Sequence, residues 1–258
     1  MYNLATAFPE KTDAERKAIA KKFYKNLVDT FIETIKMISM TEKTFAKRCT
    51  VDIEKVNAIA AKGLSIQLHS GHQMNWEYGN WVYARALNTP WIGIYQPITN
   101  KAVNKIFYDF RARFKTILVS TREFKTTMHT LFKSQYSIGL AADQNASPGS
   151  GYWMYFFSRP VPFITGPDKG ARRNKTAVVF TNFVKIKRGH YHFETRVITE
   201  NAKDFKDGEL TILYRDFLEE TIRLQPDNYL WTHRRYRHQY HPQEHEHLWK
   251  DTRPKPSV

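Results

Sequence analysis

One short stretch, LHSGHQMNWEYGN at residues 68–80, carries the side chains best suited to catalysis. It contains His72 and, five residues later, Glu77. A histidine can remove a proton from a hydroxyl with one ring nitrogen while a carboxylate accepts a hydrogen bond from the other nitrogen. The sequence therefore predicts His72 as a general base and Glu77 as the carboxylate that orients it.

Other kinds of site fit this stretch less well. His69 and His72 could ligate zinc together with Glu77, but histidines three apart at a strand end do not form a recognised ligand pattern, so we predict no metal site. A purely structural role for His72 stays open. The chain has no Gly-x-Ser-x-Gly elbow and no glycine-rich phosphate loop, and Cys49 lies in a polar helical stretch. A histidine base without a protein nucleophile suits direct attack by a substrate hydroxyl on an activated acyl group.

The neighbouring residues place His72 at the end of a strand. Residues 64–68 alternate apolar and polar side chains, the glycine at 71 permits a tight exit, and a helix is expected to begin near Asn75. In doubly wound sheets, ligands bind at the carboxyl ends of the strands. The free N–H groups of a helix that begins there could also bind an oxyanion.

Along the rest of the chain, apolar runs alternate with helical patterns. This order implies βαβ units, so the predicted fold class is α/β, with a largely parallel central sheet flanked by helices. We predict one domain over residues 1–240 and a polar tail, outside the core, over 241–258. Strands are predicted at 64–68, 91–95, 117–120, 137–142 and 176–183, helices at 75–87, 101–114, 123–134 and 208–224, and a hairpin at 184–198.

The N-terminal region predicts a long amphipathic helix over residues 13–40. Thr12 and Glu15 have the spacing of a capping box. Apolar residues recur at helical intervals and predict the buried face, whereas lysines on the other face are either solvated or in contact with an anionic membrane. The apolar set is Ile19, Phe23, Leu27, Phe31, Ile35 and Ile38, and the lysines are Lys17, Lys21, Lys22, Lys25 and Lys36.

Composition narrows the class of protein. A length of 258 residues, with 41% hydrophobic and 14% aromatic residues, is sufficient for one large core and argues against disorder. The single cysteine favours a reducing compartment, and neither a membrane span nor a signal peptide is recognisable. A formal net charge of +15 predicts anionic partners, which include nucleic acid, anionic lipid and acidic protein.

The residues around His72 resemble a known motif. The stretch from His72 to Glu77 resembles the His-X4-Glu/Asp motif of glycerolipid acyltransferases, and its Asn-Trp-Glu ending is similar to the late acyltransferases that add secondary acyl chains to lipid A. Four further blocks occur in the order of that family, between about Asn3 and Arg237. They are NLATAFPEKTDAER, YQPITNKAVNKIFYDFRARF, LAADQNASPGSGYWMYFFSRPVPFITGP and PDNYLWTHRRYR.

This resemblance implies an acyltransferase that uses the thioester of an acyl carrier protein as donor, with no other cofactor. The implied acceptor is a hydroxyl on an anionic glycolipid precursor of lipid A. Arg111 and Arg113 would suit contact with its phosphates, because guanidinium groups bind oxyanions in a bidentate manner. Substrate-binding residues implied by the matched blocks are Asn75, Asn100, Arg111, Arg113, Asp143, Gln144, Thr165 and Gly166.

Two departures from the family pattern affect the acceptor. Gln96 stands where the family commonly has arginine, and Asn228 replaces a glutamine in the closing block. A related acyltransferase that acts on another membrane lipid, such as an amino-acid lipid or a different glycolipid, is therefore the alternative. No nucleic-acid partner is predicted, because the closing block accounts for Trp231–Tyr240, the segment rich in basic and aromatic residues. We expect the cytoplasmic face of the inner membrane, reached peripherally or through an N-terminal anchor absent from this chain.

Overall fold

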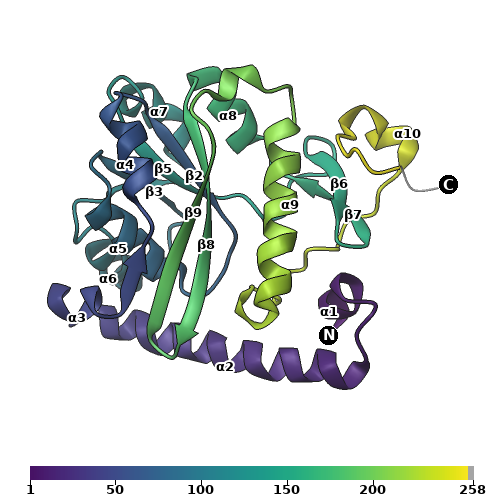
Figure 1. Ribbon diagram of the computed structural model, residues 1–258, viewed down its shortest axis with the longest axis horizontal. Helices are drawn as coiled ribbons and strands as arrows, with labels where there is room; N and C mark the ends of the chain where they lie inside the picture. Colours follow the sequence, from purple (N-terminus) through teal and green to yellow (C-terminus); the bar gives the residue numbers. More distant parts are fainter. Residues whose placement is uncertain (255–258) are drawn as a thin grey trace.

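The protein is described by a computed structural model that covers residues 1–254. Its centre is a seven-stranded sheet with the order β1-β9-β8-β2-β5-β3-β4, flanked by helices (Figure 1). Strands β8, β2, β5, β3 and β4 are mutually parallel, whereas β9 is antiparallel to β8 and parallel to β1. The predicted α/β class with a largely parallel sheet is confirmed. The strands are β1 Cys49–Val51, β2 Ile66–Ser70, β3 Trp91–Tyr95, β4 Ile117–Ser120, β5 Ser137–Ala141, β8 Ala177–Lys187 and β9 His190–Thr199.

Helices cover both faces of this sheet. The β2–α5–β3 and β3–α6–β4 connections run in one direction along the sheet, whereas β4–α7–β5 and the return from β5 through α8 to β8 run in the other. Because such crossovers are right-handed, α5 and α6 lie on one face and α7 and α8 on the opposite face. The helices are α1 Tyr2–Ala7, α2 Asp13–Met37, α3 Glu42–Ala46, α4 Glu54–Ala61, α5 Trp76–Ala86, α6 Lys101–Arg111, α7 Phe124–Leu131, α8 Gly166–Asn174, α9 Glu209–Leu224 and α10 Pro242–His245.

The core lies between the sheet and these helical layers. Strand β2 lies between two parallel neighbours and is buried along four of its five residues, so its alternating polar side chains, Gln67 and His69, are buried as well as Ile66 and Leu68. Asparagine side chains begin the two helices that follow β2 and β3: Asn75 caps α5 and Asn100 caps α6. Their side-chain oxygens accept hydrogen bonds from N–H groups of the first turn, which fixes where each helix starts.

A second, two-stranded sheet of β6 (Tyr152–Phe156) and β7 (Arg159–Phe163) lies beyond α9 (Figure 1). The C-terminal segment packs against it, and this differs from the expected polar tail outside the core. Asp251 is buried with Arg215 of α9, and the Arg215 Nη1 to Asp251 Oδ2 distance is 2.7 Å. A buried guanidinium needs a carboxylate partner, so this ion pair draws the segment inward. Residues 255–258 of the predicted tail lie outside the described residues.

Helix α2 begins with the predicted capping box, since Thr12 and Glu15 bond each other reciprocally. Its predicted buried face is wrong in the second half. Phe23 is buried, whereas Phe31, Ile35 and Ile38 are exposed. The buried side of this half is mostly polar, because side chains there bond to the β8–β9 hairpin and to the start of α5. Among the helices of residues 1–254, none is long and apolar enough to cross a membrane.

Candidate active site

His72 lies in the turn between β2 and α5, at the carboxyl edge of the sheet. Gly71 allows this turn to pass close to α9, because a Cβ at that position would lie 2.6 Å from Leu218 Cδ1. Asn75 then begins α5, and its Oδ1 accepts hydrogen bonds from the N–H groups of Glu77 and Tyr78 at 3.1 and 3.3 Å. Two of the N–H groups that we expected to be free for an oxyanion are thus already bonded.

The carboxylate that contacts His72 belongs to Asp143. Its Oδ1 lies 2.5 Å from His72 Nδ1, and its Oδ2 accepts the backbone N–H of His72 at 3.0 Å. The Asp143 side chain is 3% exposed and the His72 side chain 23%. Tyr229 also hydrogen-bonds this carboxylate. Asp143 therefore holds both the ring and the backbone of His72 in place.

Burial and charge shift the pKa values of His72 and Asp143 in opposite directions. Burial alone would lower the pKa of His72, but the charge of Asp143 and its hydrogen bond outweigh burial and hold that pKa above its usual value. Burial would raise the pKa of Asp143, yet the charge and hydrogen bonds of His72 hold it below its usual value. Both directions agree, because each group stabilises the charged form of the other.

The second ring nitrogen of His72 faces Gln144. The Gln144 Nε2 lies 3.3 Å from His72 Nε2, and the Gln144 side chain is exposed. An amide N–H that points at Nε2 is compatible with a neutral ring protonated on Nδ1, which then donates to Asp143. In that tautomer, Nε2 is the atom able to accept a proton from a substrate.

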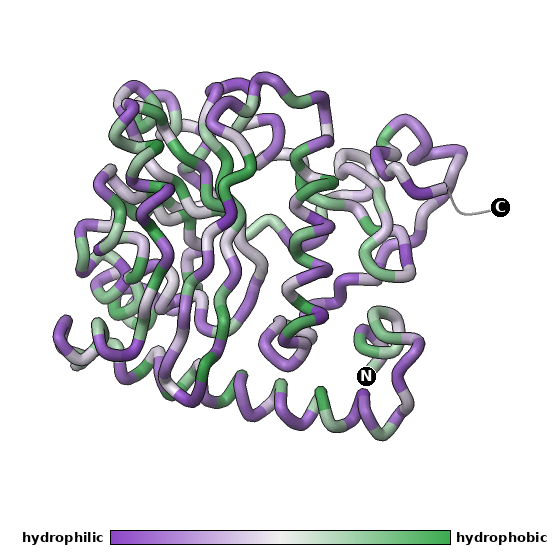
Figure 2. The backbone as a smooth tube through the Cα atoms, viewed as in Figure 1, coloured by the Kyte–Doolittle hydropathy of each residue, from purple (hydrophilic) through white to green (hydrophobic). Residues whose placement is uncertain are grey.

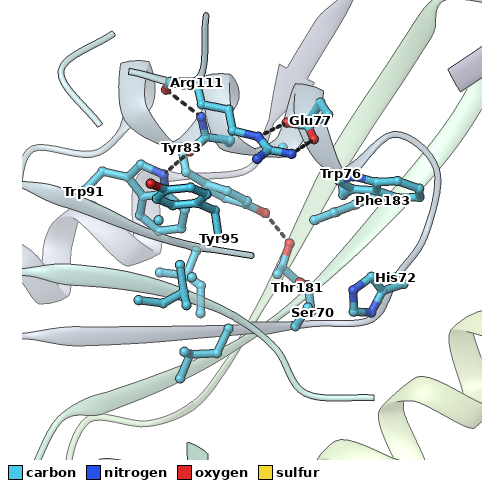
Figure 3. A pocket seen from close by; sticks show the side chains of 18 of the residues that line it. Ser70, His72, Trp76, Glu77, Tyr83, Trp91, Tyr95, Arg111, Thr181 and Phe183 are labelled. Carbon is cyan, nitrogen blue, oxygen red and sulfur yellow. Dashed lines mark hydrogen bonds and ion pairs between the residues drawn. The ribbon is translucent and has the colours of Figure 1, made fainter. Parts of the chain in front are cut away.

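Glu77 lies elsewhere than expected. Both of its carboxylate oxygens accept hydrogen bonds from Arg111, with Arg111 Nε to Glu77 Oε2 at 2.9 Å, and Figure 3 shows the guanidinium pointing at Glu77, apart from the His72 ring. Glu77 therefore holds α6 against α5, and the Arg111 fork is engaged by a carboxylate. Asp143, rather than the expected Glu77, is the carboxylate that accepts hydrogen bonds from His72.

Two cavities meet at His72. The first, of about 270 Å³, is called the α5-side cavity because α5 and β3 supply most of its other walls, and Trp76, Glu77 and, from α6, Arg111 line it (Figure 3). The second, of about 540 Å³, is called the α7-side cavity, and α7, β5 and α8 supply most of its walls. Both are lined by His72, Ile94, Gly139, Leu140 and Ala141.

The two cavities differ in chemistry. The α7-side cavity is mostly apolar, although Lys169 and Arg173 of α8 also line it. Its larger apolar side chains are Ile94, Phe124, Met128, Phe132, Ile138, Leu140 and Ile164. The α5-side cavity combines aromatic rings with polar groups, among them Asn80, Gln96 and the Glu77–Arg111 pair. Together they offer His72 one apolar and one mixed binding space.

Of the predicted site residues not yet described, Gly166 lines one of these cavities and the others do not. Thr165 precedes α8, and Gly166, its first residue, lines the α7-side cavity. Asn75 is fully buried and donates to Glu33 Oε2 at 3.2 Å, and Asn100 caps α6 at the surface. Arg113 donates to the carbonyl of Met40 at 2.9 Å, after the end of α6.

His69 does not join His72 in a metal site. It is buried near the carboxyl end of β2 with Nε2 3.0 Å from Gln67 Oε1, and burial lowers its pKa to about 3. Across residues 1–254, no group of three or more histidine, cysteine or acidic side chains is arranged to hold a metal ion. His69 is therefore a neutral core residue.

The pairing of His72 with Asp143 was missed because it depends on strand order. Ser70, the last residue of β2, pairs with Ala141, the last residue of β5. His72 and Asp143 each stand two positions after these strand ends. The signal in the sequence is this equal offset of a histidine and an aspartate after two parallel strands. It becomes readable once β5, rather than β3, is known to lie beside β2.

A comparison with protein families identifies the family of this chain. Residues 1–238 match the family described as bacterial lipid A biosynthesis acyltransferase, which covers the sheet, both cavities and the His72–Asp143 pair. A search of curated proteins found no match. Since the family match spans most of the chain, the protein is an acyltransferase and belongs to the bacterial lipid A biosynthesis acyltransferase family.

Proposed function

We propose that this protein transfers a fatty acyl chain from the thioester of an acyl carrier protein to a hydroxyl of a lipid A-type glycolipid precursor, at the cytoplasmic face of the inner membrane. The observation that carries the proposal is the position of His72, which lines both cavities while Asp143 holds its Nδ1. A base between two binding spaces suits a reaction that joins two substrates.

The chemistry follows from the tautomer of His72. The acceptor hydroxyl gives its proton to Nε2 as its oxygen attacks the thioester carbon, and Asp143 stabilises the imidazolium that forms. The tetrahedral intermediate collapses by breaking the C–S bond, and His72 returns the proton to the sulfur. The products are an ester and the carrier thiol. Gln144 lies beside Nε2, where its amide can donate to the carbonyl oxygen as negative charge develops.

The chemistry of the cavities supports one assignment of the substrates. The apolar α7-side cavity suits the donor acyl chain, and Lys169 and Arg173 suit the phosphate of the carrier's prosthetic arm. The α5-side cavity, with its aromatic rings and the Glu77–Arg111 pair, suits the acceptor. The net charge of +15 favours both anionic partners. The transfer is redox-neutral, so the proposal includes no cofactor other than the carrier thioester.

The test is mass spectrometry of products formed by the purified protein from carrier thioesters of graded chain length and a panel of lipid acceptors. We expect one added acyl ester on the glycolipid acceptor. The His72→Gln variant should lose about 10²–10⁴ in rate, the usual effect of removing a general base. His129→Gln, the same change at an exposed histidine of α7, is the matched control and should retain full activity.

The acceptor panel includes an amino-acid lipid and a glycolipid unrelated to lipid A. Acylation of one of these alone would replace the proposed acceptor while leaving the acyl transfer chemistry intact. A His72→Gln variant that turns over at the normal rate, with its fold unchanged by circular dichroism, would refute the assignment of the base.

A further inference from the structure

Helix α2 exposes apolar residues on one side and buries polar residues on the other. Phe31, Ile35 and Ile38 are 59%, 67% and 56% exposed, whereas Asp29 and Glu33 are 3% and 4% exposed. This is the reverse of an ordinary surface helix, whose apolar side faces the core. Figure 2 shows the hydrophobic positions that recur along this helix at the edge of the molecule.

The buried polar side fixes the orientation of α2. Glu33 Oε2 accepts hydrogen bonds from the Tyr191 hydroxyl at 2.8 Å and from Asn75 Nδ2 at 3.2 Å. Asp29 forms ion pairs with Lys185 at 3.0 Å and with Arg188 at 2.7 Å. Rotating α2 to bury its apolar side would break these contacts and leave carboxylates unpaired, so the exposed stripe is a stable feature of the fold.

The exposed residues form a continuous stripe, called here the α2 stripe. At about 100° per residue its five main members fall within an arc of about 80°, and the stripe is about 21 Å long. Ile32, 37% exposed, lies beside it. The members of the α2 stripe are Tyr24, Val28, Phe31, Ile35 and Ile38, each more than half exposed. An apolar surface of this extent marks an interaction site.

Lysines border the α2 stripe. Lys17 and Lys21 continue its line towards the N-terminus of α2, and Lys25 and Lys36 lie along one flank. All four are exposed, and within residues 1–254 none of them forms an ion pair with a carboxylate. Apolar side chains flanked by cations match the boundary between the acyl chains and the anionic head groups of a bilayer. A second copy of this helix would bring these lysines together, which disfavours self-association through the stripe.

The α2 stripe also lies at the active-site edge of the molecule. Helix α2 runs along the carboxyl edge of the sheet, below the end of the β8–β9 hairpin in Figure 1, and Glu33 contacts Asn75, three residues after His72. We propose that the α2 stripe inserts into the interfacial layer of an anionic bilayer and so presents the active site to lipid. From the sequence we expected the lysine face of this helix, together with exposed aromatic residues, to hold the chain at the membrane by an electrostatic attraction that salt weakens.

Salt separates the two modes of attachment. The test is flotation of the purified chain with vesicles of phosphatidylglycerol and phosphatidylcholine, at low salt and at about 0.5 M NaCl, where charges are strongly screened. We expect binding to persist at high salt. Phe31→Ser with Ile35→Ser should lower the partition coefficient at high salt by at least about tenfold, because each removes a large apolar side chain from the lipid. Lys17→Gln with Lys21→Gln should weaken binding mainly at low salt.

Leu213→Ser is the matched control, since it changes another exposed apolar helical residue, in the first turns of α9. It should leave binding within about twofold. Release of the unaltered chain by 0.5 M salt would overturn the proposal, as would a Phe31→Ser/Ile35→Ser variant that binds normally. A dimer that dissociates in this variant, with vesicle binding unchanged, would assign the stripe to self-association instead.

The inference rests on the proposed function only for the identity of the lipid substrate. Vesicle binding is measured without that substrate. Acyl transfer to an acceptor dispersed in detergent separates the two. The Phe31→Ser/Ile35→Ser variant should keep its detergent activity and lose activity on vesicles. Absence of transfer in detergent by the unaltered chain would contradict the proposed function but leave the membrane surface intact.

Discussion

Replacing Asp143 by asparagine tests which carboxylate serves His72. Asp143 uses one oxygen for the ring Nδ1 and the other for the backbone N–H of His72. An asparagine has one oxygen, and only one orientation of its amide satisfies both groups. In that orientation the oxygen accepts the backbone N–H and the NH₂ donates to Nδ1. The ring must then carry its proton on Nε2, the atom that has to accept a proton from the substrate.

Two effects on the kinetics follow from this substitution. The tautomer is wrong for general-base catalysis, so we expect kcat to fall by about 10²–10⁴. The negative charge that raises the pKa of His72 is also lost, while burial still lowers that pKa. An adjacent opposite charge is worth about 1–3 pKa units, so the acid limb of the pH–rate profile should move to lower pH by about that amount.

The assay is a pH–rate profile of the Asp143→Asn variant beside that of Glu77→Gln. Because Glu77 bonds Arg111, its substitution should leave the acid limb of the profile where it is in the unaltered protein. Thermal unfolding of the Asp143→Asn variant gives a second readout. The lowered pKa of Asp143 stabilises the fold above about pH 4, and the raised pKa of His72 does so fully below about pH 6.5. The loss in Tm should therefore be greatest between these values.

The opposite kinetic pattern would refute this reasoning. An acid limb that moves in Glu77→Gln and stays in Asp143→Asn would make Glu77 the orienting carboxylate, as the spacing in the sequence suggests. Equal losses of kcat with no movement in either variant would show that neither carboxylate sets the pKa of His72.

Three other substitutions test the cavities and the fold. Met128→Trp should fill part of the α7-side cavity, so mass spectrometry should show products with shorter acyl chains. Met128→Leu is the volume-matched control. A change in the KM of the acceptor alone would reverse the assignment of the two cavities. Asp251→Ala removes the buried one of the two carboxylates that pair with Arg215 and leaves only the half-exposed Asp216. It should cost about 1–3 kcal/mol or more in urea unfolding, whereas a loss under about 1 kcal/mol would place the C-terminal segment outside the core. Arg111→Met should lower Tm because it leaves the Glu77 carboxylate unpaired. Adding Glu77→Gln to this variant should restore part of the lost Tm. Additive losses in the double variant would show that the two residues are not coupled.

Local patterns predicted most of the elements that build the site. The apolar runs at 91–95 and 117–120 are strands with the predicted bounds, and the helix expected near Asn75 begins one residue later. These elements are determined by hydrophobic periodicity and by caps within a few residues, so a single sequence carries the information. His72 at the end of β2 follows from them.

Contacts between distant segments could not be read in this way. The spacing of Glu77 from His72 fits a hydrogen bond, but Arg111 of α6 takes the carboxylate, and the strand order places Asp143 beside His72 instead. The C-terminal segment is polar in composition, yet Asp251 is buried because Arg215 is buried. In each case the partner lies more than thirty residues away in the sequence.

The periodicity of the sequence predicts an apolar stripe on α2, but it does not determine whether that stripe faces the core or the solvent. Its polar side is bound to residues of other elements, and one of these contacts leads to the active site. Glu33 accepts from the Asn75 amide, the Asn75 oxygen caps α5, and His72 lies in the turn just before that cap. Replacing the buried carboxylate by an apolar residue would free this amide and loosen the turn. The buried polar side of α2 therefore has two effects. It directs the apolar stripe toward the surface, and it connects the stripe to the turn that contains His72. With the stripe in a bilayer, the same chain of contacts would set the height of His72 relative to the lipid surface.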